Sequence, residues 1–235
     1  MNRSLKPEDR TQALLASLKA FCLPGGEDAA REIRGVILTQ QGDFCMSPGA
    51  KWMPFTAQET IEATQSGFCW DARFGGGRWG SYVVTDAYSG GHGRLTVKLG
   101  GKVPVKKLAG VDIDIGEIQR YLSEIMMCPS ILVNHPSLEF MAVGDGALRV
   151  WDGSGPAGAT VDIEMGTDGC PAACRADRPR AVGKQSILTP WSGACLEYQE
   201  WEGLRLARRF EVSWIFPEGI FTYLRGEVTS CTARR

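Results

Sequence analysis

Four side chains stand out because their types could support chemistry inside a protein cavity. Asp86 and Tyr88 follow Val84 at alternate positions of "YVVTDAY", which places a carboxylate and a phenol on one face of a strand. Glu124 lies in the central helical stretch, and Arg225 lies near the end of an aromatic hairpin. A carboxylate can act as a general base, and a phenol or guanidinium can stabilise developing negative charge. Asp86, Tyr88 and Glu124 are therefore the candidate catalytic residues.

Arg225 is the leading candidate for binding a ligand, because the C-terminal hairpin predicts an inward side chain. A two-residue turn at 218–219 would pair Val212 with Arg225. The same register places large aromatic residues on the face of Arg225, namely Phe210, Trp214, Phe216, Phe221 and Tyr223. A buried guanidinium needs a partner. That partner is either a protein carboxylate, such as Glu227 or Asp86, or a carboxylate or carbonyl group of a ligand.

The aromatic residues predict an apolar cavity that holds an apolar or amphiphilic small molecule. The predicted ligand-binding residues are Trp70, Tyr121, Trp214, Phe216, Phe221, Tyr223 and Arg225. Two functions remain open at this point. The first is a binding protein, and the second is a cofactor-independent isomerase, lyase or cyclase that acts on a hydrophobic substrate in the same cavity. A dry cavity with one charged anchor favours binding, whereas a converging carboxylate, phenol and arginine favour catalysis.

A mostly β (α+β) fold has to position these side chains. Residues 31–235 contain short segments with the alternation of a half-buried antiparallel sheet, as in "GFCWDARF". About ten such strands at hairpin spacing predict a single antiparallel up-and-down half-barrel. Residues 1–30 are expected to form an N-terminal helical segment, and one central helix is expected at about 113–128. No shift in composition marks a second domain.

The central helix is predicted to cover the half-barrel. Its apolar residues share one arc of a helical wheel, with Tyr121 at the edge: Ile115, Ile118, Leu122, Ile125 and Met126. Glu117, Arg120 and Glu124 lie opposite, at spacings that allow ion pairs. The pattern favours charges exposed to water, in which case Arg120→Ala would cost under about 1 kcal/mol. The alternative is that Arg120 or Glu124 points at a ligand.

Charge balance and cysteine usage exclude several classes of protein. The chain has 26 basic and 27 acidic side chains, which gives no reason to expect nucleic acid or an anionic membrane as partner. No apolar run reaches the roughly 20 residues of a membrane span. The N-terminus has no apolar signal-peptide core, so we expect a cytoplasmic protein with reduced thiols. Cys170 and Cys174 have no histidine nearby, and we expect neither a metal nor another cofactor.

A basic run in a proline-rich connection begins within the stretch 166–180, which we expect to be irregular. It consists of Arg175, Arg178, Arg180 and Lys184. Blocks of like charge usually face water, so the run is predicted to be a solvated loop.

Four sequence blocks occur together in this chain: "KWMPFTAQE", "DAYSGGHGRLTVKLGG", "QRYLSEIMMCPS", and "LTPWSG" followed by "FTYLRGEV". They resemble an uncharacterised bacterial family known only as a domain of unknown function, and the resemblance runs from residue 31 to the C-terminus. The family pattern falls on Asp86, Tyr121, Glu124, Tyr223 and Arg225, among others, and implies no activity. The order of strands, central helix and strands is also similar to half-barrels of the lipoprotein-carrier type, which hold acyl chains. That similarity implies a fold and not a function.

Overall fold

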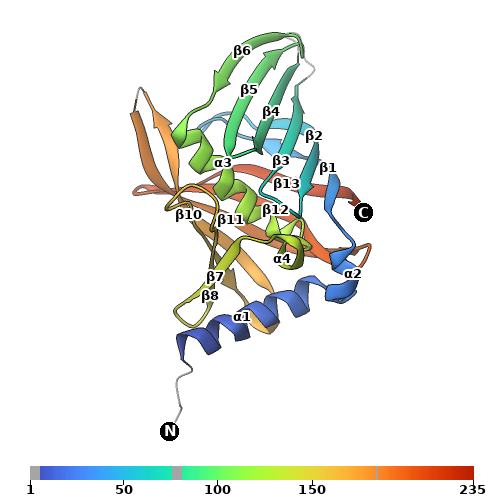
Figure 1. Ribbon diagram of the computed structural model, residues 1–235. Helices are drawn as coiled ribbons and strands as arrows, with labels where there is room; N and C mark the ends of the chain where they lie inside the picture. Colours follow the sequence, from blue (N-terminus) through green and yellow to red (C-terminus); the bar gives the residue numbers. More distant parts are fainter. Residues whose placement is uncertain (1–5, 76–80, 184) are drawn as a thin grey trace.

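A computed structural model describes residues 6–75, 81–183 and 185–235, and most of them lie in strands (Figure 1). The first six strands are β1 (Gly35–Phe44), β2 (Met53–Glu62), β3 (Phe68–Phe74), β4 (Tyr82–Ser89), β5 (His92–Leu99) and β6 (Val103–Leu108). The others are β7 (Leu138–Val143), β8 (Ala147–Asp152), β9 (Val161–Met165), β10 (Pro171–Val182), β11 (Gln185–Trp201), β12 (Leu204–Phe216) and β13 (Gly219–Arg234). The prediction of a mostly β fold is confirmed.

Within the described residues, the 13 strands form one open antiparallel sheet rather than the ten or so that the sequence predicts. The strand order is β6-β5-β4-β3-β2-β1-β13-β12-β11-β10-β9-β8-β7. The sheet thus consists of two meanders, β1 to β6 and β7 to β13, which are joined where β1 pairs with β13. The strands β6 and β7 follow one another in the sequence but lie at opposite edges of the sheet.

The segment between β6 and β7 therefore has to cross from one edge of the sheet to the other. It contains α3 (Val111–Ser123), the 3-10 turn η1 (Glu124–Met126) and α4 (Ile131–Asn134). α3 contacts β4 and β5 near one edge, and β8, β9 and β10 near the other. The sheet consequently curls around α3, which crosses its concave side (Figure 1).

The N-terminal segment forms α1 (Pro7–Cys22) and α2 (Glu27–Arg31). Proline is compatible with the first turn of a helix, and the negative charges of Glu8 and Asp9 interact favourably with the positive end of the helix dipole. α1 contacts β7, β8 and β12, and its Leu18 and Cys22 are buried in the same hydrophobic core as the strands.

Residues Pro171–Val182 form the strand β10, where the sequence predicts an irregular stretch and a solvated basic loop. Pro179 is compatible with a strand here because β9 pairs with β10 only as far as Arg175, so no N–H is needed on that side. Arg175 is exposed, but Arg178 is buried on the inner face of the sheet. The expectation of a solvated basic loop is therefore wrong for Arg178, and Lys184 lies outside the described residues.

The C-terminal hairpin of β12 and β13 has a different register from the predicted one. Its turn lies one residue earlier, at 217–218. A β-bulge then adds one residue to β13, because Ser213 pairs with Thr222 whereas the residue before Ser213 pairs with Leu224. The additional residue is Tyr223. In such a bulge, two residues of one strand lie opposite one residue of its partner.

The bulge reverses the side-chain alternation in the rest of β13. Tyr223 and Leu224 both face the inside of the sheet, so Arg225 faces outward. The Arg225 side chain is 57% exposed and pairs with Glu211 at 3.0 Å, and its guanidinium lies 4.7 Å from the ring centre of Trp52. The predicted inward orientation of Arg225 is wrong, and the cavity must have another polar anchor.

The central helix is buried on both sides. Its apolar arc is in the core, as predicted, with Ile118 and Leu122 almost fully buried. The opposite side is also buried, because Glu117 and Glu124 face the concave side of the sheet and not water. The prediction that the charged stripe is solvated is therefore wrong, whereas the alternative, that Arg120 or Glu124 points at a ligand, stays a prediction.

Candidate functional site

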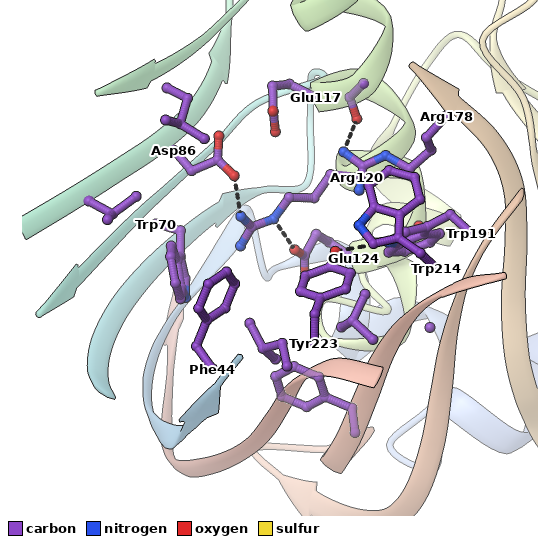
Figure 2. A pocket seen from close by; sticks show the side chains of 18 of the residues that line it. Phe44, Trp70, Asp86, Glu117, Arg120, Glu124, Arg178, Trp191, Trp214 and Tyr223 are labelled. Carbon is purple, nitrogen blue, oxygen red and sulfur yellow. Dashed lines mark hydrogen bonds and ion pairs between the residues drawn. The ribbon is translucent and has the colours of Figure 1, made fainter. Parts of the chain in front are cut away.

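A cavity of about 740 Å³ lies between α3 and the curled sheet. Strands β1 to β6 line one side, and β10 to β13 line the other. Most of its wall is apolar and aromatic, and includes Phe44, Trp70, Phe74, Trp191, Trp214 and Tyr223 (Figure 2). Met46, at 73% exposure, lies where the cavity reaches the surface. Ligand sites in proteins commonly have volumes of roughly 300–1,000 Å³, so this cavity is large enough for a small molecule.

Arg120 is the centre of an ionic cluster on the α3 side of the cavity (Figure 2). Its Nη1 lies 2.5 Å from Oδ2 of Asp86, and its Nη2 lies 2.8 Å from Oε1 of Glu59. Its Nε donates to Oε1 of Glu124 at 3.1 Å. The guanidinium also lies over the ring of Phe68 at 4.7 Å. Residues of β2, β3, β4 and η1 therefore meet at the side chain of Arg120 in α3, which is only 19% exposed.

A chain of hydrogen bonds holds Glu59 in place from the side of the sheet. The indole N–H of Trp70 donates to Oε1 of Gln40 at 2.9 Å, and Nε2 of Gln40 donates to Oε2 of Glu59 at 2.7 Å. Gln40 and Glu59 are both almost fully buried. A buried polar group must be hydrogen-bonded to be tolerated, and this network satisfies both oxygens of Glu59.

Glu59 and Glu124 of the cluster, and Glu117 beside it, bind protons more tightly than ordinary glutamates do. Burial, together with the carboxylate of Glu59, raises the pKa of Glu124 to about 8, despite the opposing effect of Arg120. Burial also raises the pKa of Glu59, although Arg120 lowers it. Burial and the carboxylate of Asp86 raise the pKa of Glu117 well above its ordinary value. The cluster therefore holds protons at neutral pH.

Two buried oxygens indicate where one of these protons lies. Among the described residues, Oδ1 of Asp86 and Oε2 of Glu117 have no hydrogen-bond donor. The two carboxyl groups interact directly, and this interaction raises the pKa of Glu117. If Glu117 is protonated, its O–H can donate a hydrogen bond to Asp86, which would give both groups a partner.

A second arginine, Arg178, lines the cavity on the side of β10. It is 9% exposed and lies 4.8 Å from the ring centre of Trp191. Its Nη2 donates to the carbonyl of Gly116 in α3 at 2.5 Å. Trp191 in turn donates from Nε1 to the hydroxyl of Tyr223 at 2.9 Å, and Tyr223 stacks on Trp214 with ring centres 6.0 Å apart. The arginine and the aromatic wall thus form one connected surface (Figure 2).

The structure brings six of the sequence-predicted residues to this cavity: Trp70, Asp86, Glu124, Trp214, Phe221 and Tyr223. It places the other four elsewhere. Tyr88 and Tyr121 are buried in the core, where the hydroxyl of Tyr121 donates to the carbonyl of Glu62 at 3.0 Å. Phe216 packs beside the cavity, against Phe221 and Arg180, and Arg225 is on the outer surface.

Sequence reasoning missed Glu59, Gln40 and Arg178. A signal existed for the first two. Glu59 lies between Ala57 and Ile61 on the apolar face of its strand, and Gln40 continues the alternation of Val36 and Leu38. A polar residue in an apolar row is informative, because it must have a buried partner.

A separate cluster of Ser66, His135 and Asp152 has the residue types of a hydrolase triad but not its hydrogen-bond order. The Ser66 hydroxyl donates to Oδ2 of Asp152 at 2.5 Å and also lies 3.1 Å from Nε2 of His135. Nδ1 of His135 accepts from the N–H of Ser137, whereas in a catalytic triad Nδ1 donates to a carboxylate. In a catalytic triad, the imidazole takes the proton of the serine. This cluster therefore links loops and does not activate a nucleophile.

The described residues contain no group of three or more His, Cys, Asp or Glu side chains that could hold a metal ion. Their helices are also too short or too polar to cross a bilayer. All eight cysteines are free.

Comparisons with known proteins agree with the similarities inferred from the sequence blocks. No curated protein sequence matches the chain. Among solved structures, a DUF1329 family protein from Desulfovibrio piger has a TM-score of 0.54 and 9% identity, over 95% of this chain and 93% of that chain. A LolA superfamily protein from Nitrosomonas europaea has a TM-score of 0.50 and 9% identity, over 96% of this chain and 94% of that chain. Similarity at this identity shows a shared fold and no function.

The sequence itself matches a family model over nearly its whole length. The match covers residues 18–232 and includes all the cavity-lining residues named above. The predicted resemblance to an uncharacterised family is confirmed, and the chain belongs to the family of unknown function DUF6920.

Proposed function

We propose that the protein binds an apolar or amphiphilic small molecule in the cavity between α3 and the sheet. The observation that carries this proposal is a cavity of about 740 Å³ with aromatic walls and a cluster of ionisable groups on one side. An apolar chain or ring system would lie against the aromatic wall, and a polar group would face α3. The fold shared with the DUF1329 and LolA superfamily proteins is compatible with this use of the concave side.

A blocked cavity provides the test. Val84 lines the cavity from β4, and Val83 faces the other side of the same strand. We expect Val84→Trp to fill part of the cavity and to weaken binding of the neutral fluorescent probe N-phenyl-1-naphthylamine by roughly tenfold or more. The matched control Val83→Trp adds the same side chain outside and should bind the probe as the unchanged protein does.

Two results would contradict the proposal. Equal probe binding by both tryptophan variants would place the probe elsewhere, and no binding by the unchanged protein would remove the reason to call the cavity a binding site. Native mass spectrometry of the protein purified from its own cells adds an independent measurement, because a retained small molecule would be seen directly. Val84→Trp should then carry less of it than Val83→Trp.

A second candidate function is acid–base catalysis in the same cavity, and a specific observation favours it. Glu124 lines the cavity, and its pKa is raised to about 8. A catalytic carboxyl group works best when its pKa lies near the working pH. Asp86 would remain a candidate base, whereas Tyr88 is outside the cavity lining, and Arg178 or Tyr223 would stabilise negative charge instead. Chemical conversion of a retained ligand, lost in Glu124→Gln while the ligand stays bound, would establish this function.

The compartment stays a prediction. The eight free cysteines suit a reducing compartment, and cell fractionation with an antibody to the protein would test this.

A further inference from the structure

Arg178 differs from Arg120 in that its charge has no protein partner at ion-pair distance. Arg120 pairs with three carboxylates, at 2.5–3.1 Å. Among the described residues, Arg178 makes no ion pair and donates one hydrogen bond, to the carbonyl of Gly116. Its buried Nε has no acceptor. A guanidinium carries five N–H donors, so most of the donors of Arg178 have no protein acceptor within the described chain.

The surroundings of Arg178 do not explain how its charge is balanced. Glu117 is a carboxyl group that interacts electrostatically with Arg178, but burial and Asp86 raise the pKa of Glu117 well above its ordinary value and so favour its neutral form. Glu117 makes no ion pair with Arg178 among the described residues, and the carboxylate of Asp86 already pairs with Arg120. A buried cation without an anion is costly, and the cost is removed if a bound molecule supplies the anion.

The side chain is nevertheless held in a fixed position. Its guanidinium stacks on Trp191 at 4.8 Å, and Nη2 is tied to α3 through the Gly116 carbonyl. Both partners line the cavity, as does Arg178 itself. A stacked and oriented guanidinium binds planar anions with little loss of side-chain entropy, because its N–H donors are already held in one plane and one orientation.

We infer that Arg178 binds the carboxylate head group of a single-chain amphiphile whose apolar chain lies along the aromatic wall of the cavity. This inference rests on the proposed binding function and specifies its ligand class. The carboxylate would accept hydrogen bonds from the guanidinium, and the chain would pass Trp214 and Phe221 toward the exposed rim at Met46. The carboxylate of Asp86, which also lines the cavity, is paired with Arg120 and therefore does not neutralise Arg178.

The first measurement uses the unchanged protein and needs no variant. Dodecanoate, dodecanol and dodecyltrimethylammonium have the same chain length and differ in head-group charge, and each is used below its micelle concentration to displace N-phenyl-1-naphthylamine. We expect dodecanoate to bind about 10- to 100-fold more tightly than dodecanol, as hydrogen bonds to a charged group predict. A preference for the ammonium compound would overturn the inference and assign the head-group site to Asp86 and Glu117.

The second measurement assigns the preference to Arg178. Arg178→Met keeps the aliphatic stem against Trp191 and removes the charge, and Arg178→Gln also allows a hydrogen bond to the Gly116 carbonyl. Both variants should bind dodecanol as before and lose the preference for dodecanoate. The control Arg175→Met makes the same change on the same strand, at an exposed side chain that pairs with Glu164, and should keep the preference.

The outcomes separate this inference from the function on which it rests. If Arg178→Met or Arg178→Gln still prefers dodecanoate, the anchor lies elsewhere although the cavity binds. If the unchanged protein binds the three amphiphiles equally well, the cavity is a site for apolar chains without head-group recognition. If it binds none of them and no probe, the proposed function fails, and the inference fails with it.

Discussion

Arg120→Met is expected to lower the free energy of unfolding by about 3–5 kcal/mol, the range found when one partner of a buried ion pair is removed. Methionine can keep the packing against Phe68 and Trp70, so the loss comes from the charge. Glu59, Asp86 and Glu124 would all lose their cation. Urea denaturation, followed by tryptophan fluorescence, measures the change.

The same experiment includes its controls. Arg175→Met removes an exposed ion pair with Glu164 and should cost under about 1 kcal/mol. The double substitution Glu59→Gln and Glu124→Gln in the Arg120→Met background should restore part of the loss, because it removes two of the unpaired carboxyl groups. A loss under about 1 kcal/mol for Arg120→Met would show that the charged side of α3 is solvated, as the helical wheel predicted.

The stability of the protein is expected to fall as the pH rises from 6.5 to 8. The pKa of Glu124 is raised from 4.5 to about 8, and those of Glu59 and Glu117 are raised as well. In this pH range the folded protein keeps protons that the unfolded chain has released. Each such proton lowers the free energy of unfolding by about 1.4 kcal/mol per pH unit. The lower limit of this pH range is chosen to exclude the titration of His135. The pKa of His135 is lowered from 6.5, and its effect on stability has the opposite sign.

Glu124→Gln should reduce this pH dependence, since glutamine cannot release a proton. The slope of unfolding free energy against pH is obtained from urea denaturation at several pH values. Glu218→Gln, at an exposed position of the C-terminal turn, is the control and should keep the slope of the unchanged protein. An equal slope in Glu124→Gln would mean that Glu124 is ionised in the folded protein throughout this range.

The sheet could be predicted from the sequence because its strands obey a local rule. In β3, the residues Phe68, Trp70, Ala72 and Phe74 are buried in alternation, as the period of two requires. The position of Asp86 on an apolar row also pointed to the cavity. The sequence around Asp86 does not reveal its partner, because Arg120 belongs to a helix whose charged face is suited to water on a helical wheel.

Three features of the site depend on tertiary structure that no local pattern encodes. The charged face of α3 is buried because α3 connects the two edges of a sheet that curls around it. Arg178 is buried because β10 is a strand despite Pro179, which lies beyond the end of the pairing with β9. Arg225 is exposed because of a bulge, and the tyrosine at position 223 is not a residue type that marks a bulge in a sequence.

The bulge at Tyr223 also determines which changes in length the C-terminal strand can accept. Side chains alternate between the two faces, so the number of residues between the turn and a given position decides the face of that position. A one-residue deletion at Tyr223 would remove the bulge, because Thr222 and Leu224 would then pair with the consecutive residues Ser213 and Val212. Leu224 would take the inward place of Tyr223, and Arg225 would stay on the outer face. A one-residue deletion in the regular part of β13 would instead move every side chain beyond it to the other face, so the bulge is the position where this strand should tolerate the loss of a single residue.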